Sequence, residues 1–158
     1  RQAWCRPMRS WSFENPPFGI ILHSSRSGQP YDEDTEYRGT VSYVSRGANG
    51  LGWNATIGRR IVTEHIAPEQ WGWNAREHSK DYLAIEFAQA RLGDPISDEQ
   101  IEAATWWIIN RARVIWPDLP LTETSLPEHR ELPAGVRDGK SDIGADQQVR
   151  ERLIERLS

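Results

Sequence analysis

The chain has 158 residues, of which 37% are hydrophobic and 27% are charged, and its formal net charge is −4. This length and composition are typical of one globular domain that can bury a core. The negative charge argues against nucleic-acid binding, which needs clustered Lys and Arg. No apolar run approaches the roughly 18 residues of a membrane span, and no secretory signal peptide is visible at the N-terminus. A single cysteine, Cys5, excludes an intrachain disulfide.

The first half of the chain alternates apolar runs with polar or glycine-rich loops. Residues 1–17 are expected to form an irregular arm, because Pro16 and Pro17 interrupt regular structure. Residues 36–45 fit both helical spacing and strand alternation, and we favour a helix. Polar or glycine-rich loops are expected at 24–34, 47–52 and 67–80. Short apolar runs predict strands at 20–23, 53–57 and 61–66.

The second half begins with a predicted strand at 82–88 and then becomes helical. Ser97 and Gln100 have the spacing of a capping box, and an apolar stripe continues that helix until Pro117 ends it. Residues 118–141 are expected to be mostly loop, with room for a short strand at 121–124. An amphipathic helix is expected to end the chain. This order of elements predicts a mixed α/β protein, with a single central mixed β-sheet flanked by helices.

Two histidines and one aspartate are the most informative candidates for chemistry. His23 ends the apolar run that begins at Phe18, whereas His129 and Asp142 lie in the late, loop-rich stretch. Two imidazoles and one carboxylate are a sufficient ligand set for a catalytic zinc, which leaves its fourth position to water. Their spacing is not a compact metal-binding motif, so the residue types alone indicate such a site only weakly.

Glu86 and Lys140 are the candidates for acid–base and electrostatic roles. Glu86 interrupts an apolar strand, where it is either a half-exposed residue facing water or a general acid or base with a shifted pKa. Lys140 precedes Asp142 by two positions and is either a solvated loop lysine or a group that stabilises an oxyanion. For His65 and His78 we favour structural roles. The eight tryptophans either pack in the core or line a groove.

Several short motifs in one order resemble the type-2 N-acetylmuramoyl-L-alanine amidases, a superfamily that includes bacteriophage lysozyme-amidases and peptidoglycan recognition proteins. The similarity runs from about Phe18 to Gly144. The matching segments are Ile-Ile-Leu-His23-Ser-Ser-Arg-Ser-Gly, Gly-Trp53-Asn54-Ala-Thr-Ile-Gly, Trp71-Gly-Trp73-Asn74-Ala75, Leu-Ala-Ile-Glu86-Phe-Ala and Gly-Lys140-Ser-Asp142, with His129 before the last. The resemblance implies an amidase-like or peptidoglycan-recognition-like fold, with residues 1–17 as an arm, 18–144 as the catalytic domain and 145–158 as a helix packed on it.

The resemblance also implies the roles of individual residues. It places the zinc ligands at His23, His129 and Asp142, and the catalytic residues at Glu86 and Lys140. Substrate contacts are expected from Trp53, Asn54, Trp73 and Asn74, with Trp71 as a further groove candidate. Many members have His where this chain has Asn54 and Asn74, and the 13 positions from His129 to Asp142 are more than is usual.

The implied activity is zinc-dependent hydrolysis of the amide bond between N-acetylmuramic acid and L-alanine in peptidoglycan. Such an enzyme would act on the cell wall as a phage endolysin, with antimicrobial action, or as a bacterial enzyme. The alternative is a module that binds peptidoglycan without cutting it, and members of that kind typically lack a complete zinc set. A third alternative is an unrelated α/β domain with structural histidines. We expect a monomer that binds the glycan strand and stem peptide.

Overall fold

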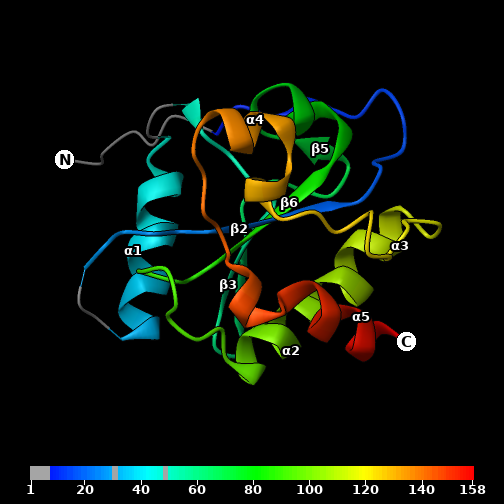
Figure 1. The fold of residues 1–158 in the computed structure, drawn as a ribbon. Helices are drawn as coiled ribbons and strands as arrows, with labels where there is room; N and C mark the ends of the chain where they lie inside the picture. The colour runs from blue at the N-terminus through cyan, green and yellow to red at the C-terminus, as the bar shows by residue number, and fades with distance from the viewer. Residues whose placement is uncertain (1–7, 30–31, 48–49) are drawn as a thin grey trace.

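A four-stranded mixed sheet forms the centre of the computed structural model, which describes residues 8–29, 32–47 and 50–158 (Figure 1). Cys5 lies outside the described residues. The strands, in their order across the sheet, are β2 (Ile20–Ser24), β6 (Leu83–Phe87), β3 (Ala55–Gly58) and β4 (Ile61–Glu64). The first three are parallel, and β4 returns antiparallel to β3 through a hairpin. All four predicted strands, and the mixed sheet, are confirmed.

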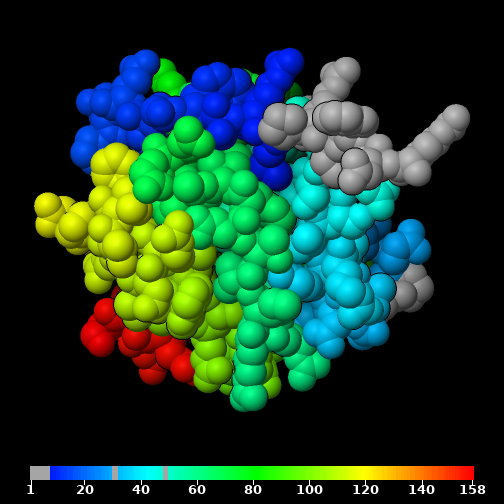
Figure 2. Space-filling model, turned by 180° about the vertical axis from the view of Figure 1, so that it is seen from behind, coloured from blue at the N-terminus to red at the C-terminus, as the bar shows by residue number. Residues whose placement is uncertain are grey.

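The expected irregular arm contains a strand that the sequence analysis missed. β1 (Trp11–Ser12) pairs antiparallel with β5 (Gln70–Trp71), inside the segment expected to be loop. The rings of Trp11 and Trp71 stack with their centroids 4.7 Å apart, which fastens the arm to the rest of the molecule. Figure 2 shows this early segment, in blue, lying against the green chain around β5. Two-residue strands are too short to show an alternating pattern.

Helices cover both faces of the sheet, as predicted. The helices are α1 (Glu33–Ser45), α2 (Asp98–Trp107), α3 (Arg113–Ile115), α4 (Pro133–Arg137) and α5 (Val149–Leu157). Asp32 caps α1, and Ser97 and Gln100 form the predicted capping box of α2. A π-helical turn, Ile108–Ala112, joins α2 to α3, and α5 packs against α2. No helix among the described residues has both the length and the apolar character of a membrane span.

Strand alternation gives the sheet one apolar face and one face that carries His23 and Glu86. On one face, the strand residues Ile20, Leu22, Leu83, Ile85 and Phe87 form a fully buried core with α2 and α5. The intervening positions of β2 and β6 carry Ile21, His23, Ala84 and Glu86 on the opposite face. Figure 1 shows α1 on the far side of the sheet from α2 and α5. The chemically reactive strand residues therefore point away from the main core.

The connection between α3 and α5 differs from the prediction. No strand forms at 121–124, because the Ser125 hydroxyl accepts from the Thr122 amide and donates to the Pro120 carbonyl, closing a turn. The chain after this turn runs beside β2 instead, where the Ser125 carbonyl accepts from the Ile20 amide at 2.9 Å. Short 3₁₀ helices form at Arg76–Asp81, His129–Glu131 and Ala145–Gln147.

Candidate metal centre and groove

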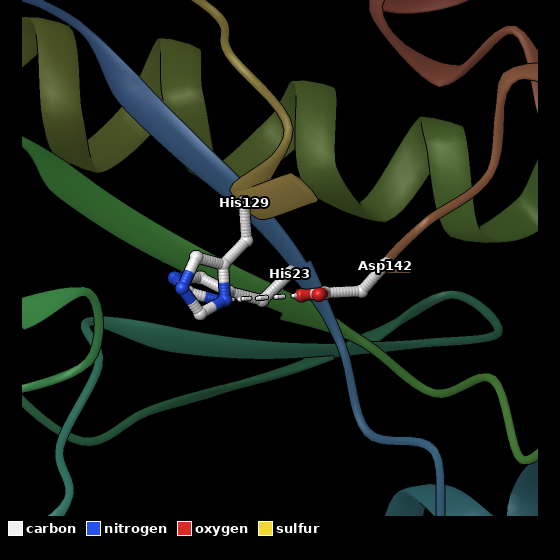
Figure 3. A group of neighbouring side chains, drawn as sticks. All are labelled: His23, His129 and Asp142. Carbon is white, nitrogen blue, oxygen red and sulfur yellow. Dashed lines mark ion pairs between the residues drawn. The ribbon is translucent and has the colours of Figure 1, made fainter. Parts of the chain in front are cut away.

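The three predicted metal ligands come together at the edge of the sheet where β2 ends (Figure 3). His23 projects from β2, His129 begins a 3₁₀ turn, and Asp142 lies in the loop before α5. The Nδ1 atoms of His23 and His129 are 3.4 and 3.5 Å from the same Asp142 Oδ2 atom. Each of the three residues is only 5% exposed. Residues separated by more than a hundred positions thus form one buried cluster.

Asp142 is held as a carboxylate in this cluster. Burial alone would raise its pKa, but the neighbouring imidazoles of His129 and His23 outweigh burial and keep the pKa well below its usual range. The Ser24 amide also points at Oδ2, at 3.4 Å. Among the described residues, the buried Nε2 atom of His129 has no hydrogen-bond partner. The cluster therefore offers a charged oxygen and imidazole nitrogens that are not fully satisfied by protein.

A folded connection explains how 13 positions still bring Asp142 back to His129. Helix α4 occupies the middle of this connection, beginning at Pro133, a residue favoured in the first turn of a helix. The Arg130 amide donates to the Asp142 carbonyl at 3.3 Å. A Cβ atom on Gly135 would lie 1.7 Å from the His129 carbonyl oxygen, so only glycine permits this packing. Neither α4 nor the role of Gly135 was predicted from the sequence.

Arg26 is a second residue whose role the sequence analysis missed. Its guanidinium donates to the carbonyls of Ser141 and Ile143, at 2.9 and 2.7 Å, and so brackets Asp142 from both sides. Its Nε atom donates to the Ser24 hydroxyl at 3.0 Å. Five donors in a planar fork suit guanidinium to such multiple contacts. In the sequence, the role of Arg26 was indicated only by its position, three residues after the candidate ligand His23.

Glu86 lies beside His23, because the two residues are partners in the parallel register of β6 and β2. It is 8% exposed, and its Oε2 atom is buried with no hydrogen-bond partner among the described residues. Burial, and then the charges of Asp142 and Glu36, raise its pKa well above the usual value, while Lys140 acts in the opposite direction. The half-exposed alternative for Glu86 is thus wrong.

A groove of about 730 Å³ opens over this cluster. Its volume is within the range of small-molecule sites. Lys140 and Asn74 line it together with the metal-ligand candidates and Glu86, while Tyr43, Leu51 and Trp53 contribute an apolar part of the wall. Trp53 is only 5% exposed and donates through Nε1 to Thr56 Oγ1 at 2.8 Å, so it forms a fixed part of the wall. Five predicted site residues, and two predicted substrate contacts, therefore share this groove.

Other predicted residues lie outside the lining of the groove. Asn54 is buried, and its side chain forms hydrogen bonds to backbone groups. Nδ2 donates to three carbonyls of residues 66–70, and Oδ1 accepts from the Ala84 amide at 2.9 Å. Trp73 is 43% exposed but is not part of the lining, and Trp71 is stacked on Trp11. Asn54 is therefore placed to hold β3 against its neighbours, since a buried amide must satisfy its hydrogen bonds.

His65 and His78 also lie away from the metal-ligand candidates. His65 Nε2 is 2.8 Å from Thr56 Oγ1, and the ring packs edge-on against Trp53. Burial lowers its pKa to about 4. His78 lies in the 3₁₀ helix Arg76–Asp81, with its Nε2 atom 3.9 Å from Glu77. These positions agree with the structural roles favoured from the sequence.

A buried acid in α1 completes the polar part of the groove. Glu36 is 5% exposed, and its carboxylate accepts from the Ser25 hydroxyl at 2.5 Å and from the amide and hydroxyl of Ser27 at 3.2 and 2.6 Å. These bonds tie the loop that follows His23 to α1. Glu36 was not identified from the sequence, where it is one of several acids near the start of a helix.

Comparison with solved structures shows the fold. The structure matches a selenomethionine AmpD derivative with a TM-score of 0.65 at 12% identity, covering 91% of this chain and 86% of that one. It matches Drosophila peptidoglycan recognition protein SD with a TM-score of 0.61 at 20% identity, covering 85% and 78%. The Ph2119 endolysin of a Thermus scotoductus bacteriophage gives 0.56 at 16% identity, covering 90% and 88%.

These matches confirm the fold expected from the sequence resemblance, which this chain shares with endolysins and with a peptidoglycan recognition protein. No protein-family model matches the sequence. No curated protein matches it either.

Proposed function

We propose that this protein is a zinc-dependent amidase that cleaves the bond between the lactyl group of N-acetylmuramic acid and L-alanine in peptidoglycan. The observation that carries the proposal is the convergence of His23, His129 and Asp142 with Glu86 in one groove. The fold shared with endolysins supports a substrate in the cell wall. The proposed catalytic domain spans residues 18–144, with α5 packed on it.

The ligand candidates fit zinc in chemistry, and their ligand atoms all lie within 4.8 Å of one another. In a tetrahedral zinc site, ligands about 2.0–2.1 Å from the metal lie about 3.3–3.4 Å from one another. The distances from Asp142 Oδ2 to the two Nδ1 atoms, 3.4 and 3.5 Å, are close to this value. Zinc bound there would lower the pKa of a water molecule toward neutrality and polarise the scissile carbonyl.

Glu86 is the proposed general base and acid. It would accept a proton from the attacking water and transfer it to the nitrogen of the leaving L-alanine. In the metal-free site, burial and the negative charges of Asp142 and Glu36 raise the pKa of Glu86. A divalent cation between the ligands would oppose this repulsion and lower the pKa. Bound metal would therefore favour the ionised form of Glu86, which is the form that can accept a proton.

Lys140 and the groove wall are proposed to bind and orient the substrate. Lys140 lines the groove, and its ammonium charge acts on Glu86, so it lies within electrostatic reach of the reacting carbonyl. It would stabilise the negative oxygen of the tetrahedral intermediate. The apolar wall at Tyr43, Leu51 and Trp53 would contact the lactyl methyl group and the ring face of the sugar.

Digestion of purified peptidoglycan, with and without a zinc chelator, tests this function. We expect mass spectrometry to find free stem peptides with N-terminal alanine, lost on chelation and restored by zinc. His23→Ala should lose both zinc and cleavage, while the matched variant His78→Ala, outside the groove, should retain both. An intact cell wall with the protein still bound to it would instead support the non-catalytic recognition module.

A further inference from the structure

Asn74 contacts the side chain of His23 from outside the metal-ligand cluster. Its Oδ1 atom lies 3.0 Å from His23 Nε2. Its Nδ2 atom donates to the carbonyls of Gly52 and Gly72, at 3.2 and 2.8 Å. A substrate-binding role was expected for Asn74, but both ends of its amide are engaged within the protein.

The two carbonyls fix the orientation of the Asn74 amide. Carbonyl oxygens only accept hydrogen bonds, so the NH₂ group must face Gly52 and Gly72, and Oδ1 must face His23. An amide oxygen also only accepts, so His23 Nε2 must carry the proton that it receives. A neutral imidazole has a single N–H group, which leaves His23 Nδ1 without a proton.

His23 Nδ1 then faces Asp142 with its lone pair. Its distance to Asp142 Oδ2 is 3.4 Å, and that oxygen also accepts from the Ser24 amide, a group that can only donate. Two acceptor atoms facing each other in a buried site repel unless a cation lies between them. We propose that Asn74 is a positioning residue that holds His23 in the Nε2–H tautomer and so presents Nδ1 to the metal. The identity of the metal as zinc rests on the proposed function.

The segment around Asn74 is itself fixed, as a positioning role requires. The Ser79 hydroxyl accepts from the backbone amides of Asn74 and Ala75, at 3.1 and 2.9 Å. A Cβ atom on Gly72 would lie 2.7 Å from the Gly52 carbonyl oxygen, so the two chain segments touch at a glycine pair. Hydrogen bonds to the second nitrogen of a ligand histidine set its tautomer and ring orientation.

The direct test is the protonation of His23 in metal-free protein, measured by long-range ¹H–¹⁵N NMR at a pH where imidazole is neutral. We expect the wild type to show His23 protonated at Nε2. Asn74→Ala should move the proton at least partly to Nδ1 and weaken zinc binding about 10- to 100-fold in a competition titration with a chromophoric chelator. Asn74→Asp keeps an acceptor oxygen for His23 and should recover the Nε2–H tautomer, but at a cost in stability, because its second oxygen then faces the carbonyls of Gly52 and Gly72.

A matched control separates positioning from simple support of the fold. Asn54→Ala removes another buried amide that does not touch His23, and should lower thermal stability without changing the His23 tautomer. Weaker zinc binding by Asn74→Ala with an unchanged tautomer would overturn the inference. So would wild-type His23 protonated at Nδ1, a result that needs no variant to fold.

These readouts are independent of the proposed function, because neither the tautomer nor zinc affinity requires substrate. If the wild type binds zinc with the expected tautomer but cleaves no peptidoglycan, the proposed amidase activity fails and the role of Asn74 stands. If cleavage is observed while Asn74→Ala retains the wild-type zinc affinity and the wild-type His23 tautomer, the proposed amidase activity stands and the role of Asn74 fails.

Discussion

Replacing Glu86 with glutamine tests the proposed mechanism most sharply, because the structure predicts opposite effects on activity and stability. Glutamine has nearly the same shape as glutamic acid but cannot accept a proton. Loss of a general acid–base group costs about 10²- to 10⁴-fold in rate, or about 3–5 kcal/mol in the activation barrier. Zinc stoichiometry should remain at the wild-type value, since Glu86 is not among the three ligand candidates.

The stability of Glu86→Gln follows from the charge state of Glu86. A group whose pKa is raised in the folded state favours folding below its unfolded pKa, and this contribution is lost as pH rises through the folded pKa. Glutamine never ionises, so the metal-free variant should match the wild type at low pH and become the more stable of the two as pH rises. Thermal unfolding of both metal-free proteins across this range measures the difference.

Glu36→Gln is the matched control, because Glu36 is the other buried acid of the groove. Its carboxylate accepts three hydrogen bonds from Ser25 and Ser27, and an amide loses part of this capacity. We expect a loss of about 1–2 kcal/mol in the free energy of unfolding, with most activity retained. Turnover by Glu86→Gln at the wild-type rate, with zinc bound, would refute the assignment of Glu86.

Three further predictions concern the support of the site and the pH dependence of the fold. Arg26→Lys should weaken zinc binding in a chelator competition, because one ammonium cannot replace the planar guanidinium. Unchanged affinity would mean that the contacts of Arg26 to the Ser141 and Ile143 carbonyls are not needed to position Asp142. Gly135→Ala forces a Cβ atom into the His129 carbonyl and should cost about 1–3 kcal/mol in urea unfolding, whereas Gly39→Ala, in an open helical position, should be neutral or stabilising. His65 has a depressed folded pKa of about 4, so the unfolded chain takes up its proton first as pH falls. Between pH 7 and 4.5 the free energy of unfolding of the wild type should therefore fall by about 2 kcal/mol more than that of His65→Gln, after allowance for partial exposure. Equal decreases in the two proteins would contradict the burial of the His65 imidazole.

The sheet and its main helices could be predicted because their signals are local. The apolar strand containing Glu86 alternates with a period of two, and the capping box at Ser97 marks the start of a helix. The order of the matching motifs then identified the three ligand candidates, His23, His129 and Asp142. Their spatial convergence depends on the parallel register of β2 and β6, which no local pattern specifies.

What the sequence analysis missed depends on contacts between distant segments. Arg26 donates to the carbonyls of Ser141 and Ile143, which lie 115 and 117 residues later in the chain. Strand β1 pairs with a strand about 60 residues away. Asn54 and Asn74 have the same side chain and similar neighbours in sequence, yet one holds backbone and the other contacts His23. Only the packing around each amide distinguishes their roles.

The metal-ligand candidates also link zinc binding to the completion of folding. His23 and Asp142 are separated by 119 positions, so a metal bound to both closes most of the chain into a loop. Zinc should bind the native state far more tightly than partly folded chains, and stabilisation by mass action then favours the closed form. Since contacts of such large sequence separation form late, zinc should mainly slow unfolding and accelerate folding little.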